Sequence, residues 1–187
     1  MSTDVIDELV GIEPGSALDA LRARRPEARE HAQRSFEALF TPSDDVSLDE
    51  RHAIAAFVTG LHQDPVVAEF YTDRLPEEFR EVIAKEIEAG KTTGPYGKYR
   101  EKELKAEDVD GPRFDSRVPD ERLAAALTHT HLLVFRPREA GPEALRKLQD
   151  AGWTTTGIVT ISQLVAFLSF QVRVVAGLRL LEKGPSA

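Results

Sequence analysis

Five residues near the C-terminus recur at intervals of four, three, four and four: Ser162, Ala166, Ser169, Arg173 and Gly177. A helix places such residues in one row on the same face. Four of them are small, and Arg173 can bind a carboxylate through two parallel hydrogen bonds. The row therefore predicts either a cavity for a small carboxylate ligand or close helix packing with Arg173 paired to a buried acid or to a helix C-terminus. Gln163 and Gln171 flank the row, as pocket donors or as core amides.

Three histidines and a tyrosine are the candidate catalytic residues. His129 and His131 lie two residues apart, so on a helix they point about 200° apart and cannot bind one metal ion together. His62 ends a predicted helix, where it is either catalytic or a partner of the helix dipole. A pKa near neutrality suits a histidine to acid/base catalysis, and a hydrogen-bonded core or interface histidine is the alternative. Tyr71 is either a proton donor or a core aromatic.

The composition excludes several classes of chemistry. The chain has no cysteine, so it offers no thiolate for catalysis or metal binding and no disulfide. The net charge of −8 argues against a nucleic-acid partner, because phosphate binding needs a basic surface. No nucleotide, zincin or serine-hydrolase motif is present, and we expect no metal and no cofactor. The acidic start of the chain does not match a signal peptide, so we expect a cytoplasmic protein.

The elements that must position these residues are predicted to be helices. Strand-period alternation is almost absent, whereas helix-start signals such as the capping box Ser47–Glu50 and the pairs Asp64-Pro65 and Pro119-Asp120 recur along the chain. The apolar segment 158–181 contains two serines, two glutamines and Arg173, which favours a core helix over a membrane span. The expected fold class is all-α, with about eight helices.

The chain is predicted to divide into a helical arm (1–44), a helical domain (45–182) and a flexible tail (183–187). Within the domain, residues 91–119 carry three glycines and three prolines without helical periodicity. A loop of this length is usually functional. We interpret it as a lid over the helical pocket or as an arm that crosses to a neighbouring subunit, and we favour the second.

The second half of the chain resembles the AhpD-like, or carboxymuconolactone decarboxylase-like (CMD), superfamily, especially its peroxidase-related branch. The resemblance covers residues 45–182 and rests on the order of the helices and on the ending of the last one. Phe170, Arg173 and Gly177-Leu178 are similar to the family's F-x-x-x-R-x-x-x-G-L, with the phenylalanine one residue closer to the arginine. The resemblance implies an AhpD-like all-α fold and a homo-oligomer.

The resemblance also identifies residues 48–75 as the counterpart of the family's catalytic helix pair. Aligning Arg51 with the family's Arg-Glu motif leaves its glutamate, two cysteines and histidine replaced by His52, Asp64, Val67 and Tyr71. Thiol peroxidase chemistry needs a thiolate and a resolving thiol, and this chain has neither. Two hypotheses follow. The protein is a cysteine-independent CMD-like lyase or AhpD-related oxidoreductase, with a histidine as acid/base, or it is a catalytically inactive small-molecule-binding or oligomeric scaffold protein.

Overall fold

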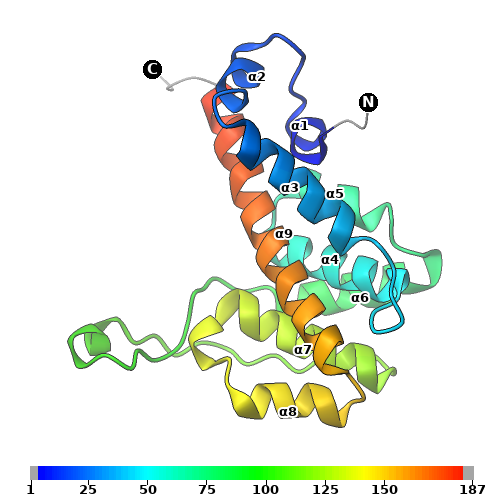
Figure 1. The fold of residues 1–187 in the computed structure, drawn as a ribbon. Coiled ribbons are helices and arrows are strands. Elements are labelled where there is room, and N and C mark those ends of the chain that lie inside the picture. The colour runs from blue at the N-terminus through cyan, green and yellow to red at the C-terminus, as the bar shows by residue number, and fades with distance from the viewer. Residues whose placement is uncertain (1–3, 183–187) are drawn as a thin grey trace.

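The fold is organised around α9 (Thr155–Glu182), the helix that carries the row of small residues (Figure 1). A computed structural model describes residues 4–182, and α9 extends for about 42 Å at 1.5 Å per residue. Helix α4 (Leu48–His62) packs against it most extensively, and residues 53–58 of α4 are fully buried. Residues 4–182 contain nine α-helices, two short 3-10 helices and no strand. The all-α prediction is confirmed, with one helix more than expected.

The N-terminal helices share this core. They are α1 (Val5–Val10), α2 (Ala17–Arg22) and α3 (Pro26–Leu39), and the first and third lie along α9. Val5 and Ile6 of α1 are 2% and 1% exposed. Buried Asp7 pairs with the guanidinium groups of Arg22 and Arg29 and so ties the three helices together. The segment set apart in the sequence as an arm thus buries apolar side chains against the long helix.

Two capping signals fix where α4 ends and its neighbour begins. Ser47 and Glu50 form the reciprocal capping box expected at the start of α4. At the other end, Gln63 adopts a left-handed conformation with φ 58°, and Asp64 caps α5 (Pro65–Thr72) by accepting hydrogen bonds from two backbone N–H groups. His62 is therefore the last residue of α4, at a sharp reversal of the chain. Helix α6 (Glu77–Gly90) then packs against α4.

Residues 91–119 are more ordered than the sequence predicts. A backbone bridge joins Gly97 to Val109, and a 3-10 helix, η1 (Lys102–Glu107), lies between them. Residues 97–109 form the green segment that projects away from the helices in Figure 1. The part that returns to the body is held by Glu86, whose carboxylate accepts two 3.2 Å bonds from the Arg117 backbone N–H.

The remaining helices close the core beside α9. Helix α7 (Glu121–Phe135) packs against both α4 and α9, and Asp120 caps its first turn. The short η2 (Pro137–Glu139) and α8 (Pro142–Asp150) follow. The indole of Trp153 donates a 2.8 Å hydrogen bond to the Arg122 carbonyl, so the turn before α9 is fixed to α7.

In length and composition, α9 also meets the criteria for a membrane-crossing helix. Its most apolar window has a mean hydropathy of 1.7, and 39% of that window is buried inside the structure. The central helix of a folded core meets the same criteria, and this one packs against α1, α2, α3, α4, α7 and α8. One face of α9 nevertheless remains uncovered, with Val159 and Phe170 about half exposed.

Candidate functional site

A cavity of about 590 Å³ opens where α9 meets the ends of α4 and α7. Its polar lining comes from four residues that the sequence singled out: His62, Ser162, Ser169 and Arg173. Its apolar lining comes from the last turn of α7, from Pro137 and from Val165 and Ala166 of α9. The small side chains of α9 leave this space open, and Gly94 and Pro95 of the long loop form the wall facing them.

His62 and Ser169 form the only hydrogen bond between two polar side chains of this cavity in the described chain. The His62 Nε2 atom lies 3.0 Å from the Ser169 hydroxyl oxygen, although the residues are 107 positions apart. Burial and, to a smaller extent, the positive charge of Arg173 together lower the pKa of His62 from 6.5 to about 4. The imidazole is therefore neutral at pH 7, so its ring can accept a proton.

Arg173 lies one helical turn beyond Ser169 and is exposed to solvent. Its guanidinium donates a 2.6 Å hydrogen bond to the Ser169 carbonyl. Within residues 4–182 it forms no ion pair, so the alternative in which a buried acid satisfies it has no support. A guanidinium has five N–H donors, and most of them remain available to an anion.

The wall opposite α9 depends on a close contact that only glycine allows. A Cβ atom at Gly94 would lie 2.9 Å from the Phe135 ring. Two residues later, the Tyr96 N–H donates a 2.6 Å bond to the Phe135 carbonyl. The base of the long loop is thus fixed to the end of α7 and lines the cavity, whereas residues 97–109 project away from the helices (Figure 1).

Two of the remaining candidates form a buried pair in the core instead. The Tyr71 hydroxyl donates a 2.7 Å hydrogen bond to Gln171 Oε1, and both residues are 0% exposed. Burial raises the pKa of Tyr71 far above its usual value. Gln171 is therefore a core amide and not a pocket donor. Gln163 is exposed to solvent and lines no part of the cavity.

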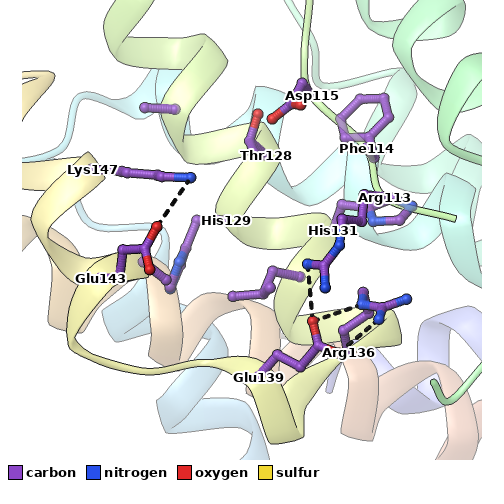
Figure 2. A pocket seen from close by; sticks show the side chains of 13 residues that line it. Arg113, Phe114, Asp115, Thr128, His129, His131, Arg136, Glu139, Glu143 and Lys147 are labelled. Atoms are coloured by element: carbon purple, nitrogen blue, oxygen red, sulfur yellow. Dashed lines mark hydrogen bonds and ion pairs between the residues drawn. The ribbon is translucent and has the colours of Figure 1, made fainter. Parts of the chain in front are cut away.

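His129 and His131 lie away from this site, in a second cavity of about 430 Å³ beneath α8 (Figure 2). His131 Nε2 lies 3.0 Å from the Gly90 carbonyl, and its ring stacks on Phe114 at 4.8 Å. His129 is 4% exposed, and neither of its ring nitrogens has a partner in the described chain. Burial lowers the pKa of both histidines, so both are neutral at pH 7.

The rim of this second cavity is a set of charge pairs. Figure 2 shows Arg136 and Arg113 converging on Glu139, with Lys147 near Glu143 on α8. Arg136 is buried and also donates a 2.7 Å bond to the Gly111 carbonyl, which fixes the returning loop. Residues 4–182 contain no group of three histidines or acids that could bind a metal ion. The contacts of Arg136 and Glu139 join the returning loop to the end of α7 and to η2.

The cavity residues that sequence reasoning missed are the apolar ones. In the sequence they have the pattern of an ordinary helix end, and no motif marks them; they are Leu133, Val134 and Phe135. Gly94 and Pro95 belong to the loop 91–119 that the sequence singles out, but no motif marks these two residues as cavity lining. Their role depends on the loop folding back onto α7, which no local pattern encodes.

Neither the family models, nor the curated proteins, nor the solved structures compared with this chain gave a match.

Proposed function

We propose that the cavity between α4, α7 and α9 binds a small carboxylate, with Arg173 as the anion-binding group. The observation that carries this proposal is that an arginine without an acidic partner in residues 4–182 lines the same 590 Å³ cavity as the hydrogen-bonded pair His62–Ser169. Arginine is better suited than lysine to bind a carboxylate, because its planar guanidinium group can donate to both carboxylate oxygens at once. The apolar lining from α7 and Val165 suits the hydrocarbon part of such a ligand.

We further propose that His62 is the acid/base residue of a cysteine-independent reaction. A pKa of about 4 makes the free imidazole a weak base. A carboxylate bound to Arg173 neutralises the charge that disfavours the imidazolium, so binding raises the pKa of His62 toward the range of an efficient base. His62 takes a proton from one carbon of the ligand, the electron pair of that C–H bond expels a leaving group from the neighbouring carbon, and the imidazolium gives its proton to that group. The proposed step is redox-neutral and therefore needs no redox cofactor.

A cysteine-independent CMD-like lyase is the class of enzyme that we propose on the resemblance. Support comes from the position of His62 and Asp64 at the reversal between α4 and α5, the helix pair that the resemblance identifies with the family's catalytic one. Peroxidase turnover is not part of the proposal, because the sequence contains no cysteine. The second candidate is a binding protein without catalysis. It is favoured by the absence, among residues 4–182, of a carboxylate hydrogen-bonded to His62.

Calorimetric titration with benzoate, a carboxylate with an apolar ring, tests the binding site. We expect Arg173→Ala to weaken benzoate binding about 10- to 100-fold, as the loss of a charged hydrogen-bond partner does. Arg173→Lys should lose less affinity for benzoate than Arg173→Ala. The control Arg146→Ala changes an exposed residue of α8 and should bind benzoate as tightly as the wild type. Equal affinity in the Arg173→Ala protein would refute the site.

Deuterium exchange separates the enzyme from the binding protein. The probe is 4-oxopentanoate, whose C–H bonds next to the ketone are weakly acidic, followed by NMR in D₂O. Catalysed exchange that is lost in His62→Gln, with 4-oxopentanoate binding retained, supports the acid/base role. Binding without exchange above background assigns the cavity to the inactive binding protein.

A further inference from the structure

His129 is a buried polar side chain without a hydrogen-bond partner. It is 4% exposed, and neither ring nitrogen has a partner in the part of the chain that the structure describes. Native proteins rarely leave a buried polar group in this state, because such a group loses its bonds to water without replacing them. His131 on the same helix differs, since its Nε2 atom lies 3.0 Å from the Gly90 carbonyl. His129 therefore has a hydrogen-bonding capacity that residues 4–182 do not use.

This unused capacity lies at a cavity of ligand size. The second cavity has a volume of about 430 Å³, and His129 is part of its lining. Binding sites for small molecules are typically about 300 to 1,000 Å³, and an apolar cavity of about 150 Å³ can bind benzene. Figure 2 shows His129 on the side where Glu143 and Lys147 lie, and His131 with Phe114 on the other side. The cavity is thus large enough for a molecule with one aromatic ring.

The charges around this cavity balance, which favours a neutral ligand. Its lining has three basic and three acidic side chains, namely Arg113, Arg136, Lys147, Asp115, Glu139 and Glu143. Each basic side chain has an acidic partner in the lining, because the two arginines pair with Glu139 and the lysine pairs with Glu143. An ion gains no net attraction from such a lining. The cavity beside Arg173 differs, because that arginine has no acidic partner in residues 4–182.

The chemistry of a neutral imidazole identifies the polar group of the ligand. Burial lowers the pKa of His129, so the ring is neutral at pH 7 and offers one N–H donor and one acceptor nitrogen. A hydroxyl group can donate to that nitrogen or accept from that N–H, whereas a carbonyl group can only accept. The apolar part of the lining consists of Phe114, Ala125, Leu132 and Ala144. Such side chains suit a hydrocarbon ring.

The mouth of the cavity can open because α8 is held loosely. Leu148 is the one buried residue of α8. The side chains of Glu143 and Lys147 are 80% and 71% exposed, and Lys147 Nζ lies 3.9 Å from Glu143 Oε1. A surface ion pair of this kind is weak. Both side chains can therefore rotate away, and a small ligand can reach the buried ring of His129.

We propose that the cavity between α7 and α8 is a second binding site, which takes a small neutral phenol whose hydroxyl group hydrogen-bonds to His129. The hydroxyl supplies the partner that the imidazole lacks within residues 4–182. The aromatic ring of the ligand packs on Leu132 and Phe114. The inference rests on His129 and its surroundings and does not depend on what the cavity beside Arg173 binds.

Titration with 4-methylphenol, a phenol that is neutral at pH 7, tests the site, and toluene is the matched probe without the hydroxyl group. NMR of the histidine rings follows both titrations, and the signal that disappears in His129→Leu identifies the His129 resonance. We expect 4-methylphenol to shift that resonance and to bind about 3- to 10-fold more tightly than toluene, as one neutral hydrogen bond provides. Equal affinity for the two probes overturns the proposal. No binding of 4-methylphenol leaves water as the partner of His129 and overturns it as well.

His129→Leu removes both ring nitrogens and leaves an apolar side chain in their place. We expect this variant to bind 4-methylphenol about 3- to 10-fold more weakly than the wild type, because the hydrogen bond is lost, and to bind toluene at least as tightly. The matched control is His31→Leu, because His31 is exposed on α3; its affinity for both probes should equal that of the wild type. Unchanged affinity for 4-methylphenol in His129→Leu contradicts the role of the imidazole.

A variant on α8 keeps the proposal testable if His129→Leu does not fold. Ala144→Trp places a large ring in the cavity and should abolish binding of 4-methylphenol while keeping the helical circular dichroism of the wild type. Arg173→Ala should leave the affinity for 4-methylphenol unchanged. The opposite pattern, with binding lost in Arg173→Ala and retained in Ala144→Trp, assigns the phenol to the other cavity and overturns the proposal.

Discussion

Replacing Arg173 by alanine should raise the pKa of His62 measurably but not to its ordinary value. In the structure, the pKa of His62 falls from 6.5 to about 4, with burial as the larger cause and the charge of Arg173 as the smaller one. Arg173 therefore accounts for less than half of the lowering, and the variant should titrate between about 4 and about 5. One pH unit corresponds to about 1.4 kcal/mol, which a unit charge supplies from roughly 12 Å at an effective dielectric constant of 20.

NMR titration of the histidine rings measures the pKa of His62 directly. The chain has five histidines, and the signal that disappears in His62→Gln identifies the His62 resonance. Arg146→Ala serves as the control for the loss of one positive charge elsewhere on the surface. An unchanged pKa in Arg173→Ala would show that the guanidinium charge does not reach the imidazole. A return to 6.5 would show that burial is not the main cause. Either result refutes the electrostatic account of the site.

Three further predictions concern stability. The pKa of His62 is 6.5 in the unfolded chain and about 4 in the folded chain, so the free energy of unfolding should fall as the pH drops from 6.5 to 4. The expected loss is about 1–2 kcal/mol for a half-buried ring. Urea unfolding should show a weaker pH dependence of this free energy for His62→Gln. Tyr71→Phe should cost about 1–3 kcal/mol by leaving the buried Gln171 amide without its donor, and Tyr71→Phe combined with Gln171→Leu should recover most of that cost in the same urea assay. Arg51→Ala should lower the melting temperature, because Arg51 is 3% exposed and donates hydrogen bonds of 3.0 and 2.5 Å to two backbone carbonyls before α4. Arg51→Lys should recover part of the lost melting temperature. A full recovery would contradict the need for both hydrogen bonds.

Local signals predicted the helices well because the caps are short-range chemistry. The capping box at Ser47, the Asp64 cap and the start of α7 at Asp120 all occur as the sequence indicates. The long loop was harder, because its order comes from partners far away in the chain. Glu86 holds its return and Phe135 holds its base, and neither residue is marked by a local pattern.

Helical geometry also accounts for which candidates reach the cavity. Ser162, Ser169 and Arg173 share the row and line the cavity together. Gln171 lies two residues from Ser169, about 200° around the helix, and so enters the core to meet Tyr71. Gln163 lies about 100° from Ser162 and faces solvent. The flanking glutamines were left open in the sequence because the direction of the core around α9 is a tertiary property.

The length of α4 determines where His62 lies relative to α9. Ser47 and Asp64 bound a helix of fifteen residues, which places its last side chain about 22 Å from the first. At that distance His62 meets the middle of α9, one turn before Arg173, and Nε2 comes within 3.0 Å of the Ser169 hydroxyl. One residue more or fewer in α4 would rotate His62 by about 100° and remove it from the cavity. Ser47 and Asp64, which do not line the cavity, therefore determine whether His62 and Arg173 share it.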